Sequence, residues 1–153
     1  MRLWRLSGMR HAHSFDGGYG IAFDGRWNTN GHAVTYCATS PSLCVLEKLV
    51  HVEDPRLLPD LVMLAYEVPE PTSVQTIPLE DLPPDWRRRE SLTQSRGDAW
   101  HGARAALLLK APSAIVALAG SPDWNVVINH DHPGAKAIRL AGATPFALDA
   151  RLL

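Results

Sequence analysis

The hydrophobic and polar positions of the chain alternate in short blocks, and most of these blocks are typical of strands. Apolar runs predict strands at Leu3–Leu6, His32–Ala38 and Leu61–Val68. Further strands are expected at Ser73–Ile77, at Ser113–Ala119, on both sides of a polar turn within residues 123–142, and at an edge in residues 144–153. Short strands with few helices, and without regular βαβ alternation, favour an α+β domain.

The first predicted helix has clear local signals. Ser40 suits the N-cap, and Pro41 suits the first helical position. At about 100° per residue, the apolar side chains fall on one arc and Lys48 faces the opposite way. Glu47 falls at the edge of this arc, one turn before His51, so we expect its carboxylate at the boundary of the core. The arc consists of Leu43, Val45, Leu46, Leu49 and Val50.

Three other segments complete the pattern. A second helix is predicted to begin at Asp98, which would act as its cap, and to run to Lys110. The glycine-rich segment Met9–Gly31 predicts a long loop with tight turns. We interpret Trp86–Glu90 as a solvated run of charge.

Composition narrows the class of protein. A chain of 153 residues predicts one domain, and 46% hydrophobic with 20% charged residues is ordinary for a globular core. A formal net charge of −1 argues against a nucleic-acid-binding surface. Without a signal peptide or an apolar run of ~18 residues, a cytoplasmic protein is expected, with no contact with a membrane. Cys37 and Cys44 lack CxxC spacing and are interpreted as reduced structural thiols.

The segment Gly25–Asn28 carries the first candidate chemistry. A glycine turn presents Arg26 beside an aromatic ring and an amide, a set suited to a phosphate, a ring and a ribose. A guanidinium recognises phosphate through paired hydrogen bonds. The alternative is that Arg26 and Glu47 form a structural ion pair, or are two surface charges that never meet. Glu47 could equally form a routine i,i+4 pair with His51, and Tyr36 could be a packing residue of its strand.

Other motifs exclude several chemistries. The pairs His11-x-His13 and His130-x-His132 lack the spacing of a zinc site, and no thiolate or carboxylate set completes four ligands, so no metal is expected. The dinucleotide and P-loop glycine patterns are absent, as is a GxSxG elbow.

Together, these pieces resemble the RES-domain family, which is named for an arginine, a glutamate and a serine. The resemblance runs through "GRWN…G…V.Y.A.S…L..LE.LVH" from Gly25 to His51, and it resumes at "GDAW", "APSAIV", "NVVINHDHP" and "DARLL", covering nearly the whole chain. The chain departs from the family at Ala111, where valine is common. It departs again at His130, where proline usually follows the asparagine, so no role is carried over to Asn129 or His132.

The resemblance implies an ADP-ribosyltransferase-like fold: one domain over residues 1–153, with short strands in a small split or mixed sheet and a few flanking helices. It implies a toxin that breaks the nicotinamide–ribose bond of NAD+, by hydrolysis or phosphorolysis, without a metal. Arg26, Glu47 and Tyr36 are the expected catalytic residues. The expected NAD+-binding residues are Arg26, Trp27, Asn28, Tyr36 and Ser113.

Two other functions stay open. The first is an ADP-ribosyltransferase that modifies a specific host protein, and the second is a non-catalytic member that binds only an antitoxin or a nucleotide. A metal-dependent hydrolase that uses the histidines is a weaker third. The resemblance implies an Xre-type helix-turn-helix antitoxin as partner, with room for a homodimer within that complex and no direct binding of nucleic acid by this chain.

Overall fold

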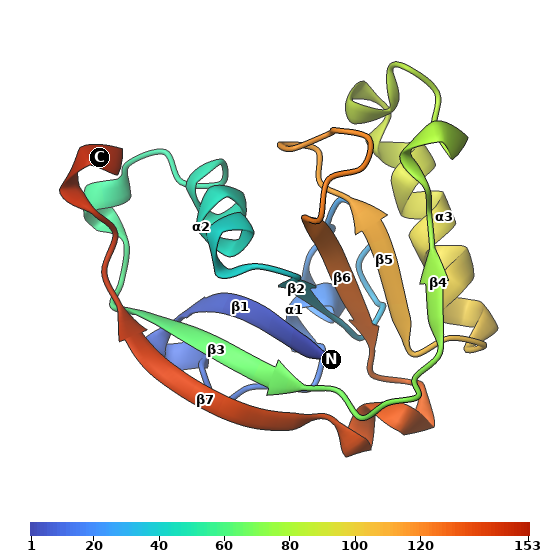
Figure 1. The fold of residues 1–153 in the computed structure, drawn as a ribbon, viewed down its shortest axis with the longest axis horizontal. Coiled ribbons are helices and arrows are strands. Elements are labelled where there is room, and N and C mark those ends of the chain that lie inside the picture. The colour runs from blue at the N-terminus through green and yellow to red at the C-terminus, as the bar shows by residue number, and fades with distance from the viewer.

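The computed structural model describes all 153 residues and contains one seven-stranded mixed sheet with the order β4-β5-β6-β2-β1-β3-β7 (Figure 1). All neighbouring strands are antiparallel except β4 and β5. The strands are β1 (Arg2–Gly8), β2 (Val34–Ala38), β3 (Leu61–Glu67), β4 (Val74–Thr76), β5 (Leu108–Pro112), β6 (Trp124–Asn129) and β7 (Arg139–Phe146). The α-helices are α1 (Gly18–Ala22), α2 (Pro41–Leu49) and α3 (Glu90–Ala103). The predicted α+β class is confirmed.

Short 3₁₀ helices fill several connections: η1 (Met9–His11), η2 (Pro55–Leu57), η3 (Leu79–Asp81), η4 (Trp86–Arg88), η5 (Pro133–Ala137) and η6 (Ala150–Leu152). None of the helices is both long and apolar enough to span a bilayer.

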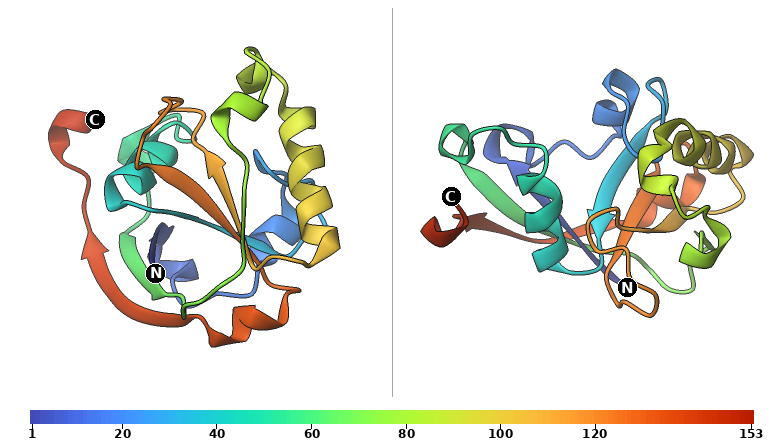
Figure 2. Two further views of the ribbon diagram at one scale, coloured as in Figure 1. Left: turned by 45° about the vertical axis from the view of Figure 1, so that its right-hand side comes forward. Right: turned by 90° about the horizontal axis from the view of Figure 1, so that it is seen from above.

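The sheet bends into two wings that meet at β2. In Figures 1 and 2, strands β1, β3 and β7 form one wing, and β6, β5 and β4 form the other. Helix α2 packs over the first wing and α3 covers the second. Because both helices contact the same face of β2, the residues between them lie at the junction of the two wings.

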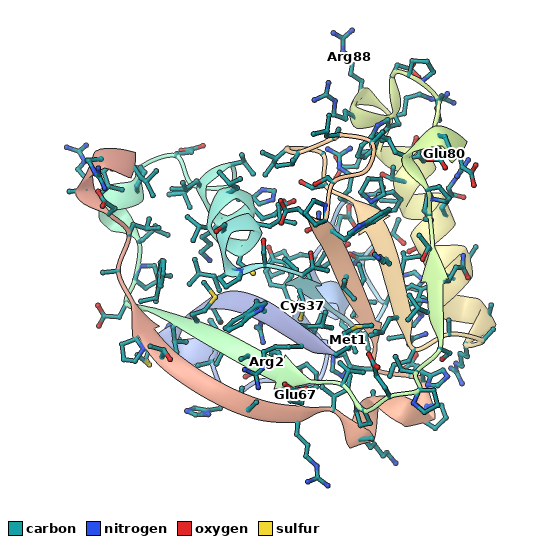
Figure 3. The ribbon with its side chains drawn as sticks, in the orientation of Figure 1. Met1, Arg2, Cys37, Glu67, Glu80 and Arg88 are labelled. Carbon is teal, nitrogen blue, oxygen red and sulfur yellow. The ribbon has the colours of Figure 1, made fainter.

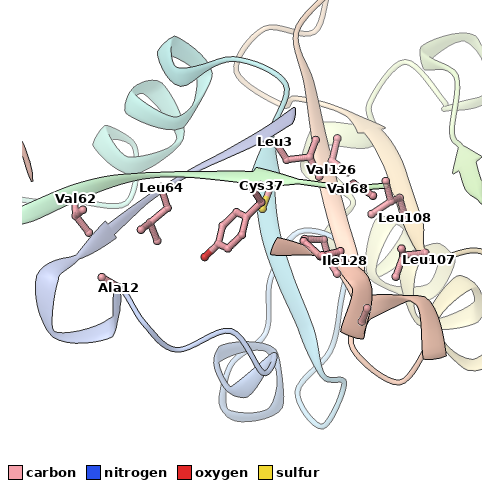
Figure 4. Packing of buried hydrophobic residues seen from close by; sticks show 13 residues of the cluster. Leu3, Ala12, Cys37, Val62, Leu64, Val68, Leu107, Leu108, Val126 and Ile128 are labelled. Atoms are coloured by element: carbon pink, nitrogen blue, oxygen red, sulfur yellow. The ribbon is translucent and has the colours of Figure 1, made fainter. Parts of the chain in front are cut away.

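The core divides according to the faces of the sheet, because side chains alternate along each strand. A cluster of 13 buried residues, drawn in Figure 4, occupies the face away from α2 and α3 and includes Cys37 of β2 and Ile128 of β6. On the opposite face, three tryptophans pack between the second wing and α3. They are Trp27, Trp86 and Trp100. A smaller cluster lies beneath α2 and includes Ala38 and Leu43.

Helix α2 begins as predicted. Ser40 Oγ accepts the N–H of Leu43 at 3.2 Å, and Pro41 is the first helical residue. The same hydroxyl donates to Asp123 Oδ1 at 2.7 Å, which ties the helix start to β6. The predicted apolar arc is only partly covered, because Leu46 is 39% exposed and its neighbour one turn on, Val50, is 59% exposed.

The prediction for the second helix is wrong at both ends. Helix α3 begins at Glu90 rather than Asp98, without a side-chain cap. It ends before Arg104, whose left-handed φ of 52° stops the helix. Leu108 and Leu109 begin β5, a buried strand, instead of continuing a helix. Asp98 lies inside α3 and uses its carboxylate in a tertiary contact described below.

Four further expectations are corrected. Residues 113–119 form an irregular segment rather than a strand. The glycine-rich loop contains the short helix α1. In the run that begins at Trp86, the three arginines are exposed but the tryptophan is 4% exposed and belongs to the core. The C-terminal edge strand exists, but it is β7, which starts at Arg139 and ends at Phe146.

Candidate functional site

Glu47 lies on the side of α2 that faces the ends of β5 and β6. Its Oε1 accepts a hydrogen bond from Ser113 Oγ at 2.9 Å and another from Asn125 Nδ2 at 2.8 Å. Oε2 accepts no hydrogen bond from any residue of the chain. The side chain is half-buried, as expected for the boundary of the core. One oxygen of the carboxylate is therefore fixed, while the other is left for a further contact.

Ser113 is fully buried and follows the last residue of β5. Its Oγ accepts the backbone N–H groups of Ile115 at 3.0 Å and Val116 at 3.2 Å. A serine that bonds the backbone two and three residues ahead offers the chain an alternative to the sheet ladder, which explains why the strand stops here. The hydroxyl proton points to Glu47, so Ser113 orients the carboxylate.

Tyr36 lies on the same face of the sheet as this carboxylate. In the β2–β6 pair, Tyr36 is opposite Val127 and Ala38 is opposite Asn125. Residues directly opposite share a face, as do residues two apart in one strand. Tyr36 and Asn125, whose amide donates to Glu47, are therefore diagonal neighbours, with their Cα atoms about 7–8 Å apart.

The phenol of Tyr36 supports the segment that carries Arg26. It accepts the backbone N–H of Trp27 at 2.9 Å and donates to Asn28 Oδ1 at 2.7 Å. Burial raises the pKa of Tyr36 well above its ordinary value of 10.0, so the phenol stays neutral at physiological pH.

Trp27 and Asn28, both predicted to bind a nucleotide, are each 1% exposed. The indole packs in the tryptophan cluster, and Asn28 Nδ2 donates to three backbone carbonyls. These belong to Gly20 at 3.3 Å, Phe23 at 3.2 Å and Thr29 at 2.9 Å. In this structure both side chains hold the Arg26 loop in place, and a contact with NAD+ stays a prediction.

Helix α3 braces the same loop from the other side. Thr93 Oγ1 donates to the carbonyl of Arg26 at 2.6 Å, and Gln94 Nε2 donates to the carbonyl of Gly25 at 3.0 Å. A Cβ at Gly97 would overlap the backbone of Trp27, so only glycine allows this approach. Sequence analysis missed these contacts, although a glycine inside a helix is a signal of close backbone approach.

Asp98 adds a further tie between α3 and the loop. Its two carboxylate oxygens accept the backbone N–H of Thr29 at 2.9 Å and the Thr29 hydroxyl at 2.7 Å. His32 Nδ1 lies 3.4 Å from the same carboxylate. An acid that resembles a helix cap in the sequence therefore anchors the loop.

Arg26 and Glu47 do not form an ion pair. Arg26 Nη1 donates instead to the backbone carbonyl of Arg87 at 3.1 Å. Arg87 Nη1 in turn approaches the carbonyl of Ala114 at 3.5 Å, one residue after Ser113. A continuous series of contacts thus joins Arg26 to the group that orients Glu47. The i,i+4 contact with His51 is not formed either, because the Glu47 carboxylate bonds only Ser113 and Asn125.

A cavity of about 220 Å³ flanks this region. Its lining includes Pro112, which precedes Ser113, and also Asp123 and Trp124, which precede Asn125. A larger cavity of about 510 Å³ lies elsewhere, between the segment 55–61 and the C-terminal residues 145–148.

Other chemically active residues are not gathered into a second centre. No group of three or more His, Cys, Asp or Glu side chains is arranged to hold a metal ion. Cys37 and Cys44 are free and buried, as the sequence predicted. Burial raises the pKa of Cys37 and raises that of Cys44 to about 12, so neither thiol is ionised enough at neutral pH to act as a nucleophile.

Comparison with known proteins gives matches over nearly the whole chain. The family model described as RES domain matches residues 2–149. A protein of Photorhabdus laumondii named Toxin Res is 33% identical over 100% of this chain and 97% of its own length. A Toxin Res of Pseudomonas putida is 35% identical over 99% of both chains.

Two further matches extend the comparison. A protein of Sphingobium sp. named Prs ADP-ribosylating toxin is 31% identical over 84% of this chain and 80% of its own. Among solved structures, a chain in the crystal structure of the M. tuberculosis MbcT–MbcA toxin–antitoxin complex superposes with a TM-score of 0.70, covering 95% of this chain and 84% of that one. The identity is 17%, so this likeness concerns the fold.

Proposed function

Because the chain belongs to the RES domain family, we propose that it is the toxin of a bacterial toxin–antitoxin system and that it destroys NAD+ by breaking the nicotinamide–ribose bond. Full-length relatives named Toxin Res support the first part. The arrangement around Glu47 supports the second.

The chemistry makes few demands on the protein. The leaving group is a neutral pyridine, so it needs no proton, and the ribose becomes an oxocarbenium-like cation as at glycosidase transition states. An anion fixed beside that cation lowers the barrier, because it is oriented before the reaction begins. Glu47, with Oε1 held by two donors and Oε2 unbonded, fits this role, and this observation carries the proposal.

The other residues receive supporting roles. Arg26 binds the phosphates, and Tyr36 contributes to the nicotinamide side of the site. Ser113 orients Glu47. When water captures the ribosyl cation, the products are nicotinamide, ADP-ribose and a proton. When inorganic phosphate captures it, they are nicotinamide and ADP-ribose 1″-phosphate.

Incubation of the purified protein with NAD+, with and without phosphate, tests this proposal through the identity of the products. Glu47→Gln keeps the shape and the acceptor oxygen for Ser113 and Asn125, so the fold should persist. Loss of the negative charge should lower kcat/KM by about 10²–10³-fold. Glu53→Gln, an exposed acid nearby in the chain, is the matched control. Near-normal turnover by Glu47→Gln excludes the carboxylate from the mechanism.

A second candidate is transfer of ADP-ribose to a protein, because the Sphingobium relative is named an ADP-ribosylating toxin. The same cation forms, but a protein side chain captures it. Mass spectrometry of cellular proteins after brief induction of wild type and Glu47→Gln separates the two functions. A defined protein adduct in the wild-type sample favours transfer, whereas free ADP-ribose or its phosphate favours destruction of NAD+.

An antitoxin partner completes the proposal. An enzyme that consumes NAD+ harms its own cell, and the structural neighbour was solved as a toxin–antitoxin complex. We expect an Xre-type helix-turn-helix protein to bind this chain and to suppress the activity. Co-expression followed by size-exclusion chromatography tests the complex, and it also reports whether two copies of this chain are present.

A further inference from the structure

Arg87 occupies a special position in the contacts around the proposed site. Its backbone carbonyl accepts the hydrogen bond from Arg26 Nη1 at 3.1 Å. Its own guanidinium reaches the other way, to the carbonyl of Ala114 at 3.5 Å. Ala114 follows Ser113, which orients Glu47. Arg87 therefore lies between Arg26 and the residues that hold Glu47: its backbone contacts Arg26, and its side chain reaches Ala114.

Helix η4 fixes this position through its tryptophan. Trp86 is buried against Trp27, with ring centroids 6.1 Å apart, and the guanidinium carbon of Arg26 lies 5.9 Å from the Trp86 ring centroid. Because Trp86 is packed in the tryptophan cluster next to Arg26, the backbone of Arg87 lies beside the Arg26 guanidinium. Arg88 instead points away from the body of the protein, as Figure 3 shows. Arg87 thus faces the proposed site, whereas Arg88 of the same short helix faces solvent.

The guanidinium groups of Arg26 and Arg87 both face neutral carbonyls. Neither has a carboxylate oxygen within 4.0 Å, whereas Arg89 in the same run lies 3.8 Å from Asp85. A guanidinium has five N–H donors, and each of these two uses one of them within the protein. The 3.5 Å contact of Arg87 is long, so a charged acceptor would replace it readily. Two cations joined by the hydrogen bond from Arg26 to the Arg87 carbonyl, each with unused donors, suit a ligand with two adjacent anionic groups.

We propose that Arg87 and Arg26 together bind the pyrophosphate of NAD+, so that Arg87 is a second phosphate anchor. This inference rests on the proposed function. The contacts run from Arg26 to Arg87, then to Ala114, and from the adjacent Ser113 to Glu47. In NAD+, the pyrophosphate is likewise followed by the ribose that carries nicotinamide.

The test compares Arg87→Ala, Arg87→Lys and the control Arg88→Ala. Calorimetric titration with ADP-ribose, which contains the pyrophosphate but cannot lose nicotinamide, measures binding without turnover. Loss of a charged pair of hydrogen bonds should weaken binding by Arg87→Ala about 10- to 100-fold. Arg87→Lys should keep part of the affinity, and Arg88→Ala should bind like wild type. The carbonyl that holds Arg26 belongs to the backbone and is retained in every variant.

A second measurement separates an anchor from a structural residue. In turnover, Arg87→Ala should lose kcat/KM for NAD+ but keep it for nicotinamide riboside, which has no phosphate. Equal losses on both substrates, or unchanged binding of ADP-ribose, overturn the inference. If wild type binds ADP-ribose through Arg87 but cleaves neither substrate, the pyrophosphate site stands and the proposed reaction fails.

Discussion

Gly97→Ala tests whether the Arg26 loop depends on direct backbone contact with α3. A Cβ at this position would overlap the carbonyl oxygen of Trp27 and lie 2.6 Å from its carbonyl carbon, whereas ordinary contact begins at 3.4 Å. Helix and loop must therefore separate by at least about 0.8 Å, measured from the carbon alone. Both neighbours are backbone, so no side chain can rotate to relieve the overlap.

The expected cost follows from that separation. Overpacking of a core costs about 1–3 kcal/mol, and we expect the upper part of this range because Trp27 is buried and must move with the loop. Alanine improves helix propensity by about 1 kcal/mol, which offsets part of the cost. A displacement near 1 Å of groups that position a substrate can lower a rate by about 10²-fold. Gly97→Ala should therefore lose stability and, with it, the proposed cleavage of NAD+.

Gly102→Ala is the matched control, because it lies in the same helix and a Cβ there meets nothing within 4 Å. It should keep full activity and gain up to about 1 kcal/mol from helix propensity. Urea unfolding followed by circular dichroism gives both free energies of unfolding. If the two alanine variants prove equally stable and equally active, the loop does not rest on the helix as described.

Two further predictions concern Tyr36 and the histidines His101 and His130. Tyr36→Phe leaves the N–H of Trp27 and the amide oxygen of Asn28 without the phenol, so it should lower the free energy of unfolding by about 1–3 kcal/mol; an unchanged urea midpoint contradicts this. Burial lowers the pKa of His101 and of His130 below 6.5, so the unfolded chain binds more protons than the folded protein below that pH, and stability should fall as the pH drops from 7 to 5. An NMR titration of the His101 and His130 imidazoles should give midpoints below 6.5, and midpoints at or above 6.5 refute the reasoning.

Local signals predicted the helix that carries Glu47 well. The Ser40 cap, Pro41 and the apolar spacing located α2, and the position of Glu47 at the edge of the apolar arc anticipated its half-buried carboxylate. These features depend only on residues within one or two helical turns of each other, so they can be recognised from the sequence alone.

Tertiary contacts decided the features that the sequence did not reveal. Asp98 has the position of a helix cap but binds Thr29, while α3 begins uncapped at Glu90. The donors to Glu47 come from residues 66 and 78 positions further along the chain, and no local pattern connects them. Asparagine is uncommon in strands, so Asn125 and Asn129 were the local signs of polar roles in β6.

The long separation between Glu47 and its donors has a consequence for synthesis on the ribosome. The acid emerges early, but Ser113 and Asn125 emerge only in the last third of translation, and both large loops must then close. Closure of such distant pairs is slow compared with the formation of a helix. A nascent chain therefore carries a Glu47 carboxylate without its partners, and products that stop before residue 113 lack both donors.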